Sequence, residues 1–106
     1  MAWICLLIAG LLEVVWAFSM KQSEGFTKLG ATVVTIVTMI ASFGLLSYSM
    51  RSLPLGTAYT IWTGIGAIGA FVVGIVFLGE PAGMLRILAA SLIIGGLVLM
   101  KMSSVG

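Results

Sequence analysis

Glu13 is the residue in this sequence that is best placed to do chemistry, because it is an acid inside an apolar run. The run covers residues 3–20 and carries no other charged side chain. A helix that crosses a hydrocarbon core of about 30 Å needs roughly 17–25 residues, so this run can span a bilayer. A carboxylate at that depth costs on the order of 2–3 kcal/mol on insertion scales and usually lines a cavity or an ion path. We therefore expect Glu13 to bind protons or cations. The alternative is a protonated Glu13 that only hydrogen-bonds a neighbouring helix.

Three aromatic residues are predicted to surround this carboxylate. Trp16 follows Glu13 by three positions and shares its helix face, while Tyr59 and Trp62 share a face in the third apolar run. An aromatic face attracts a cation with about 0.5–2 kcal/mol. Trp16 could instead anchor its helix at the membrane interface, although Trp3 suits that role better. We interpret Trp16, Tyr59 and Trp62 as residues that line a cation site.

A carboxylate in a partly desolvated cavity can hold a proton near neutral pH, because burial disfavours its charged form. A cation that displaces the proton gains an ion pair and contact with the aromatic rings. Guanidinium suits such a site best, since its planar donors match the two carboxylate oxygens. If two copies of Glu13 face each other across a dimer, they titrate as a coupled pair. Competition between a proton and a cation for one carboxylate is sufficient for antiport.

Hydroxyl groups recur along one face of the second apolar run. Ser and Thr in membrane helices bond across helices or back to their own carbonyls, and we expect this packing role for most of them. Ser42 lies deepest in the run, and we expect it to connect to Glu13. The residues of this face are Thr32, Thr35, Thr38, Ser42 and Ser49.

Small residues are dense in the third and fourth runs. Gly64 and Gly66 allow another backbone to come close and also weaken the helix, so we interpret them as a packing site and a hinge. In the fourth run, Ser91, Gly95 and Gly96 form a small-residue face without any ionisable group. That face predicts helix association, most simply between subunits.

The composition is that of an integral membrane protein. Of its 106 residues, 61% are hydrophobic and 8% are charged, whereas soluble domains carry about 25% charged residues. The sequence has no histidine and one cysteine, so it predicts neither a metal site nor an intrachain disulfide. No basic cluster supports a nucleic-acid partner. Without a nucleophile paired with a base, or a nucleotide-binding loop, we expect no enzyme and no cofactor.

Polar breaks divide the chain into four apolar runs at residues 3–20, 29–50, 56–78 and 85–100. The second run ends before Pro54, since proline disfavours helix in the preceding residue. The first run lacks a positively charged start and is interrupted by Glu13, so we interpret it as a retained helix and not a signal peptide. The prediction is one all-α domain over residues 1–106, with four transmembrane helices and both termini on the same side.

The charges between the helices show almost no bias toward one side. Arg51 and Lys101 fall on the side of the termini, and Lys21, Lys28 and Arg86 fall on the other. The positive-inside rule therefore predicts weak or dual orientation. Transporters often use inverted repeats around a midplane site, and four helices are too few to contain one. An antiparallel homodimer would supply it.

With these motifs in view, the chain resembles the small multidrug resistance family, and within it the guanidinium-exporter subtype. The resemblance covers essentially the whole chain, and its motifs are specific together although most are not specific singly. The segments that carry it are Leu12-Glu-Val-Val-Trp16, Lys21, Ser23-Glu-Gly-Phe-Thr27, Leu53-Pro54, Gly56-Thr-Ala-Tyr59 and Ile61-Trp-Thr-Gly-Ile-Gly66. Trp16 with Trp62-Thr63 favours the guanidinium subtype. Phe18-Ser-Met20, Thr60 and the face at Ser91 depart from the typical member.

The resemblance implies a proton-coupled exporter in the bacterial inner membrane that works as an antiparallel homodimer. Glu13 would be the carboxylate shared by proton and substrate. The residues that would line the site are Trp16, Ser42, Tyr59 and Trp62. Gly64-Ile-Gly66 would mark a bend in the third helix, and the fourth helix would be the dimerisation arm.

Three other functions remain open from the sequence. A quaternary-ammonium or multidrug exporter of the same family would have a bulkier and less directional site. A proton-relay subunit of a membrane complex would use Glu13 but has no need of the aromatic residues. A purely structural subunit would not repay the cost of placing Glu13 in the membrane.

Overall fold

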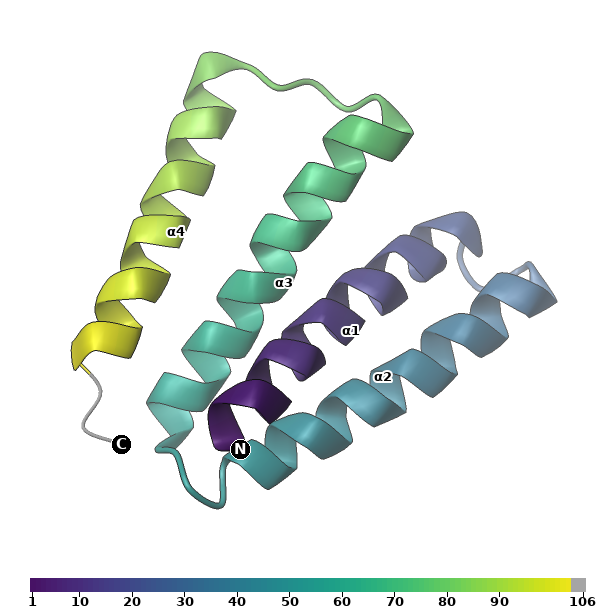
Figure 1. The fold of residues 1–106 in the computed structure, drawn as a ribbon. Coiled ribbons are helices and arrows are strands. Elements are labelled where there is room, and N and C mark those ends of the chain that lie inside the picture. Colours follow the sequence, from purple (N-terminus) through teal and green to yellow (C-terminus); the bar gives the residue numbers. More distant parts are fainter. Residues whose placement is uncertain (104–106) are drawn as a thin grey trace.

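The computed structural model describes residues 1–103 and contains four α-helices (Figure 1). Each helix is long and apolar enough to cross a membrane, which confirms the predicted all-α class with four spans. The fourth helix extends three residues beyond its predicted end, so that Lys101 lies in its last turn. The helices are α1 (Ala2–Gln22), α2 (Leu29–Ser49), α3 (Leu55–Leu78) and α4 (Met84–Ser103).

The helix boundaries follow from local backbone chemistry. Between α1 and α2, the buried Ser23 hydroxyl donates to the Met20 carbonyl at 2.7 Å and accepts from the Phe26 N–H at 3.0 Å. Pro54, which cannot donate a backbone hydrogen bond, precedes the first turn of α3. At the other end of α3, Gly79 adopts a left-handed conformation with φ of 68° and ends the helix.

The four helices form a single layer in the order α2, α1, α3, α4 (Figure 1). The described part of the chain measures 43 × 35 × 16 Å. A helix with its side chains is about 10–12 Å across, so the shortest dimension is little more than one helix. The N-terminus and the end of α4 lie at the same end of the layer. One such layer cannot enclose a central cavity by itself.

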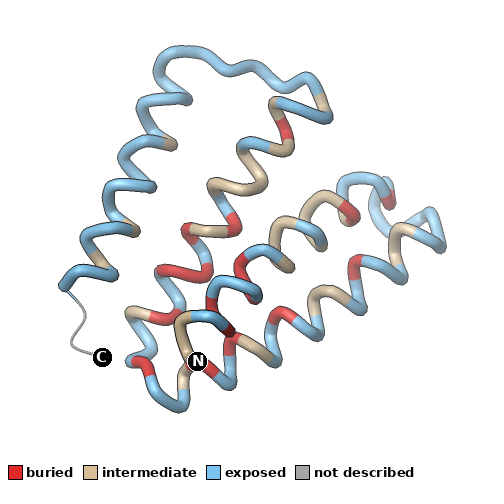
Figure 2. Tube along the Cα trace, viewed as in Figure 1, coloured by how far each residue is buried: buried red, intermediate tan, exposed pale blue. Residues whose placement is uncertain are grey.

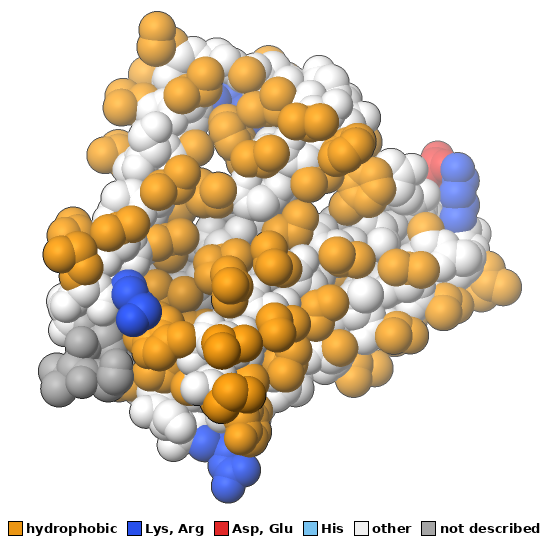
Figure 3. Space-filling model, viewed as in Figure 1, with side chains coloured by type: hydrophobic (Ala, Val, Ile, Leu, Met, Phe, Trp, Pro, Cys, Tyr) orange, Lys and Arg blue, Asp and Glu red, His pale blue; other side chains and the backbone are white. Residues whose placement is uncertain are grey.

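The core lies where α1 packs against α2 and α3. Its buried apolar residues are Leu6, Ala9, Leu46, Leu53, Ala58, Ile61 and Trp62. Within the described chain α4 has no buried residue, and its trace is almost uniformly pale blue in Figure 2. Figure 3 shows hydrophobic side chains spread over the whole of the face in view, with only a few charged side chains among them. This exposure is what a helix layer needs when its solvent is lipid.

Glycines set the closeness of the α1–α3 contact. The Ile65 side chain of α3 occupies the space where Gly10 of α1 lacks a side chain, and Val14 of α1 does the same at Gly69 of α3. A Cβ at either glycine would overlap its neighbour. Small residues let membrane helices approach in this way, so the contact fixes how the faces of α1 and α3 meet.

Candidate functional site

Glu13 lies in the α1–α3 contact, with its carboxylate against the backbone of Gly66. A Cβ added at Gly66 would overlap that carboxylate, so only glycine leaves room for it. The Oε1 atom of Glu13 is buried and has no hydrogen-bond partner within residues 1–103. A buried acceptor without a partner costs about 1–3 kcal/mol or more, which marks this oxygen as a place for a proton or a ligand.

Trp16 supplies the second unpartnered polar atom. Its indole Nε1 is buried without a hydrogen-bond partner, and among residues 1–103 this holds for only one other side-chain atom, Glu13 Oε1. Because the two residues are three positions apart on α1, they lie about one turn from each other. An unmet acceptor and an unmet donor therefore occur on one face of one helix.

The aromatic residues form a continuous row across three helices. The ring of Trp16 meets Phe43 of α2 edge-on at 6.3 Å between centroids, and Phe43 meets Trp62 of α3 at 5.7 Å. Tyr59 continues the row from Trp62 at 5.7 Å. The structure thus brings together Trp16, Tyr59 and Trp62, as the sequence predicts, and Phe43 is what connects them.

Phe43 is a site residue that the sequence reasoning missed. It is the one aromatic residue in the middle of α2 and follows Ser42 directly. In a membrane helix such a position is typical of a side chain that faces lipid, and Phe43 is indeed 47% exposed. Its neighbour Ser42 was the available signal, because a residue next to a buried polar group lies near the helix contact.

Ser42 connects α2 to both neighbouring helices. Its hydroxyl donates to the Ala9 carbonyl of α1 at 2.7 Å and accepts from Trp62 Nε1 of α3 at 3.0 Å. The expected contact with Glu13 is not made in this structure. A serine hydroxyl has one proton to donate, and here the Ala9 carbonyl, one turn before Glu13, receives it. Ser42 therefore fixes the Trp62 ring rather than the carboxylate.

The other hydroxyls of this α2 face bond within their own helix. Thr32, Thr35, Thr38 and Ser49 each donate to a carbonyl three or four residues earlier. Such bonds satisfy the hydroxyl without holding two helices together. Ser42 is thus distinguished from its neighbours by its partner and not by its residue type.

Gly64 accommodates α4, because the Leu97 side chain fills the space where a Cβ would stand. Tyr59 is about half exposed and lines the groove between α3 and α4 together with Gly64 and Gly96. The helix α3 is continuous through Gly64 and Gly66, so the hinge remains a prediction.

On α4, the predicted association face is open. A Cβ at Gly95 or Gly96 would meet no heavy atom within 4 Å, and the Ser91 hydroxyl donates to the Ile87 carbonyl of the same helix. Association of this face with a second subunit remains a prediction.

The described residues contain no group of three metal-ligating side chains. What the site offers is one carboxylate with an unmet oxygen, a row of four aromatic rings and an unmet indole N–H. This set is suited to bind a proton or an organic cation.

The chain is similar to known proteins over almost its whole length. The family model described as Small Multidrug Resistance protein matches residues 1–93. A protein of Yersinia pseudotuberculosis named guanidinium exporter is 55% identical over 104 residues, which cover 98% of this chain and all of that protein. Guanidinium exporters of Citrobacter freundii and Salmonella typhimurium strain LT2 are 54% and 53% identical, again over 98% of this chain and 99% of each relative. This multi-pass membrane protein belongs to the small multidrug resistance family.

Proposed function

We propose that this protein exports guanidinium and small substituted guanidinium cations in exchange for protons. It is then a transporter and not an enzyme, and it acts in the bacterial inner membrane as an antiparallel homodimer. The names of its relatives support the export of a small cation. The observation that carries the proposal is the buried Glu13 oxygen without a partner, next to the aromatic row.

The chemistry of the site favours guanidinium among cations. A guanidinium ion is planar and can donate two parallel hydrogen bonds to a carboxylate. It also stacks on aromatic faces, which Trp16, Phe43 and Trp62 supply. Only a deprotonated Glu13 can hold it, so proton and cation exclude each other. Release of one on binding of the other couples the two fluxes.

The single helix layer supports a dimeric site. Because one layer is 16 Å thick, a single chain leaves the aromatic row accessible from outside. A second copy laid against it would enclose the two carboxylates and exclude water and lipid. The nearly balanced loop charges permit that copy to insert in the opposite orientation. The same site could then open alternately to the two sides of the membrane.

The direct test is a calorimetric titration of the purified protein with guanidinium at several pH values. Competition by one proton lowers the apparent affinity by up to about tenfold for each unit of falling pH. Glu13→Gln is expected to lose binding at every pH. The matched control is Glu80→Gln, which removes a carboxylate from the exposed loop before α4 and should bind like the wild type. Affinity that does not depend on pH, or that survives Glu13→Gln, would contradict the proposal.

Two further measurements separate the neighbouring functions. Proton-coupled uptake into vesicles should be larger for guanidinium than for tetraethylammonium, and transport of tetraethylammonium alone would identify a quaternary-ammonium exporter instead. Trp62→Ala should reduce guanidinium-driven proton flux, because it removes the centre of the aromatic row. Unaltered proton flux in that variant would favour a proton relay.

A further inference from the structure

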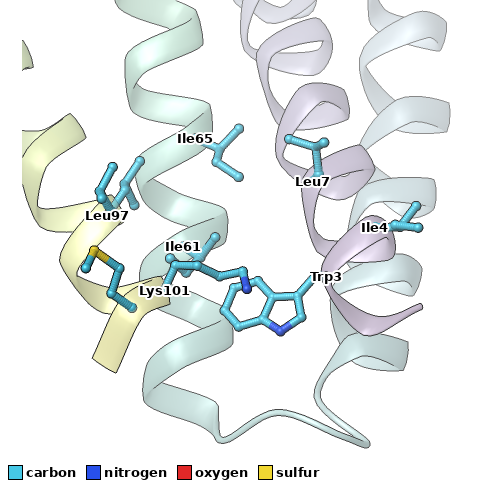
Figure 4. A pocket seen from close by; sticks show the side chains of 9 residues that line it. Trp3, Ile4, Leu7, Ile61, Ile65, Leu97 and Lys101 are labelled. Atoms are coloured by element: carbon cyan, nitrogen blue, oxygen red, sulfur yellow. The ribbon is translucent and has the colours of Figure 1, made fainter. Parts of the chain in front are cut away.

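An apolar groove lies outside the aromatic row, at the end of the layer that holds the N-terminus and the last turn of α4 (Figure 4). It is bounded by α1, α3 and α4 and has a volume of about 470 Å³. The helices α1 and α4 do not pack against each other in the described chain, so α3 forms the floor between them. Its apolar walls and floor are formed by Ile4, Leu7, Ile61, Ile65, Leu97 and Val98.

One cation closes the end of this groove. The Nζ atom of Lys101 lies 4.3 Å from the centroid of the Trp3 ring, and Figure 4 shows the ammonium group above the indole. No side-chain carboxylate within residues 1–103 forms an ion pair with Lys101. A lysine and a tryptophan at the end of a membrane helix typically mark the level of the lipid headgroups.

The charged side chains of residues 1–103 at this end of the layer have one sign. Lys101 and Arg51 are here, whereas the acidic side chains Glu24 and Glu80 are in the loops at the opposite end. An organic cation would be repelled by Lys101, so the groove is not a second site for such a substrate. A ligand with an anionic group and an apolar chain would fit this groove. The anion would lie on the Lys101 ammonium at the end of the groove, and the chain would lie along the apolar walls.

We propose that the groove between α1, α3 and α4 binds one acidic phospholipid, with its phosphate on Lys101 and an acyl chain along the apolar walls. Basic residues between membrane helices bind acidic lipids by this combination of charge and apolar contact. This inference does not depend on the transported substrate.

The shape of the groove favours a lipid over a second helix. Helices associate closely in membranes where small residues meet. No glycine lines this groove, and its branched side chains leave a channel that a flexible chain can follow. By contrast, Gly64, Ala67 and Gly96 line the neighbouring groove between α3 and α4, which suits an approaching backbone better.

The test compares spin-labelled phosphatidylglycerol with spin-labelled phosphatidylcholine in phosphatidylcholine vesicles that contain the full-length protein. Electron spin resonance measures the motionally restricted fraction of each. One lysine near the surface should favour phosphatidylglycerol by about fivefold. Lys101→Gln should bring the two lipids to equal restriction, while Lys101→Arg keeps the preference. The far-ultraviolet circular dichroism spectrum, measured in parallel, shows that each variant is folded.

Arg86→Gln is the matched charge control. Arg86 lies over the Phe71 ring at the other end of α4, beside a smaller groove of about 230 Å³. The Arg86→Gln variant should therefore keep the preference for phosphatidylglycerol unchanged. If Arg86→Gln lowers the preference as much as Lys101→Gln does, the attraction is general and the site is overturned.

A second pair of variants tests the groove itself. Leu7 and Leu11 of α1 are 51% and 53% exposed, and only Leu7 lines the groove. Leu7→Trp should therefore abolish the preference, while Leu11→Trp retains it. Energy transfer between labelled subunits tests the competing occupant. Dissociation of the dimer by Leu7→Trp but not by Leu11→Trp, together with equal restriction of both lipids by the wild type, would assign the groove to a second subunit and refute the lipid.

Discussion

The contacts of α3 with α1 and with α4 are built from the same residue types but differ in what they enclose. Against α1, glycines on both sides receive large side chains: Ile65 at Gly10, Val14 at Gly69 and the Glu13 carboxylate at Gly66. Against α4, one glycine of α3 receives Leu97, and no residue of α4 is buried in the described chain. The first contact surrounds a polar group, and the second leaves a helix largely uncovered.

The difference shows that glycine-rich faces in this chain have two uses. Where a glycine meets its own chain, it fixes the position of a specific neighbour, as Gly66 does for Glu13. Where a glycine faces open space, as Gly95 does, it leaves a surface to which another helix can come close. The α1–α3 contact therefore determines where the Glu13 carboxylate lies, while the uncovered face of α4 is where we propose that a second subunit binds.

The largest expected effect comes from filling the α1–α3 contact. Gly66→Ala places a methyl group where the Glu13 carboxylate lies, so the carboxylate must move. A displacement of about 1 Å in a binding group can cost on the order of 100-fold in activity. Guanidinium-driven proton flux in vesicles should fall by about that factor.

Gly44→Ala is the control for this substitution. A Cβ at Gly44 on α2 would meet no heavy atom within 4 Å, so flux should stay near the wild-type rate. Equal rates for Gly66→Ala and the wild type would show that the contact does not position Glu13.

The next largest effect concerns the hydrogen bonds that join the helices. Ser42→Ala removes the bond to the Ala9 carbonyl and leaves Trp62 Nε1 buried without an acceptor. Loss of a buried partner costs about 1–3 kcal/mol, and the free energy of unfolding in mixed micelles should decrease by that amount.

Ser49→Ala is a matched control on the same helix. Ser49 is fully buried like Ser42, but its hydroxyl bonds the Leu46 carbonyl of its own helix. Ser49→Ala should lower the free energy of unfolding clearly less than Ser42→Ala does. Equal losses for the two variants would mean that the bonds between helices contribute nothing beyond burial of a hydroxyl.

The helices and the buried acid could be predicted from the sequence, whereas the contacts between helices could not. Four apolar runs with charged or proline-containing breaks specify four helices, because the bilayer fixes their length. Glu13 stands out because a charge in such a run is costly. The partner of Ser42 was predicted wrongly, since helical spacing identifies a shared face but not the neighbouring helix that the face meets. Phe43 was not predicted as a site residue, because an aromatic side chain can face lipid without a free-energy cost and its residue type therefore gives no signal in the sequence.

The smallest expected effect is on the open face of α4. Gly95→Leu places a large side chain where a second subunit is proposed to pack, while nothing in the same chain lies within 4 Å. The variant should fold normally, and its dimer should dissociate about fivefold more readily, which corresponds to about 1 kcal/mol of helix packing. Energy transfer between labelled subunits at decreasing protein-to-lipid ratios measures this shift. Gly30→Leu, at an equally open position near the start of α2, should not change the dissociation. If neither variant weakens the dimer, the subunits do not meet at Gly95, and the open glycines of α4 need another explanation.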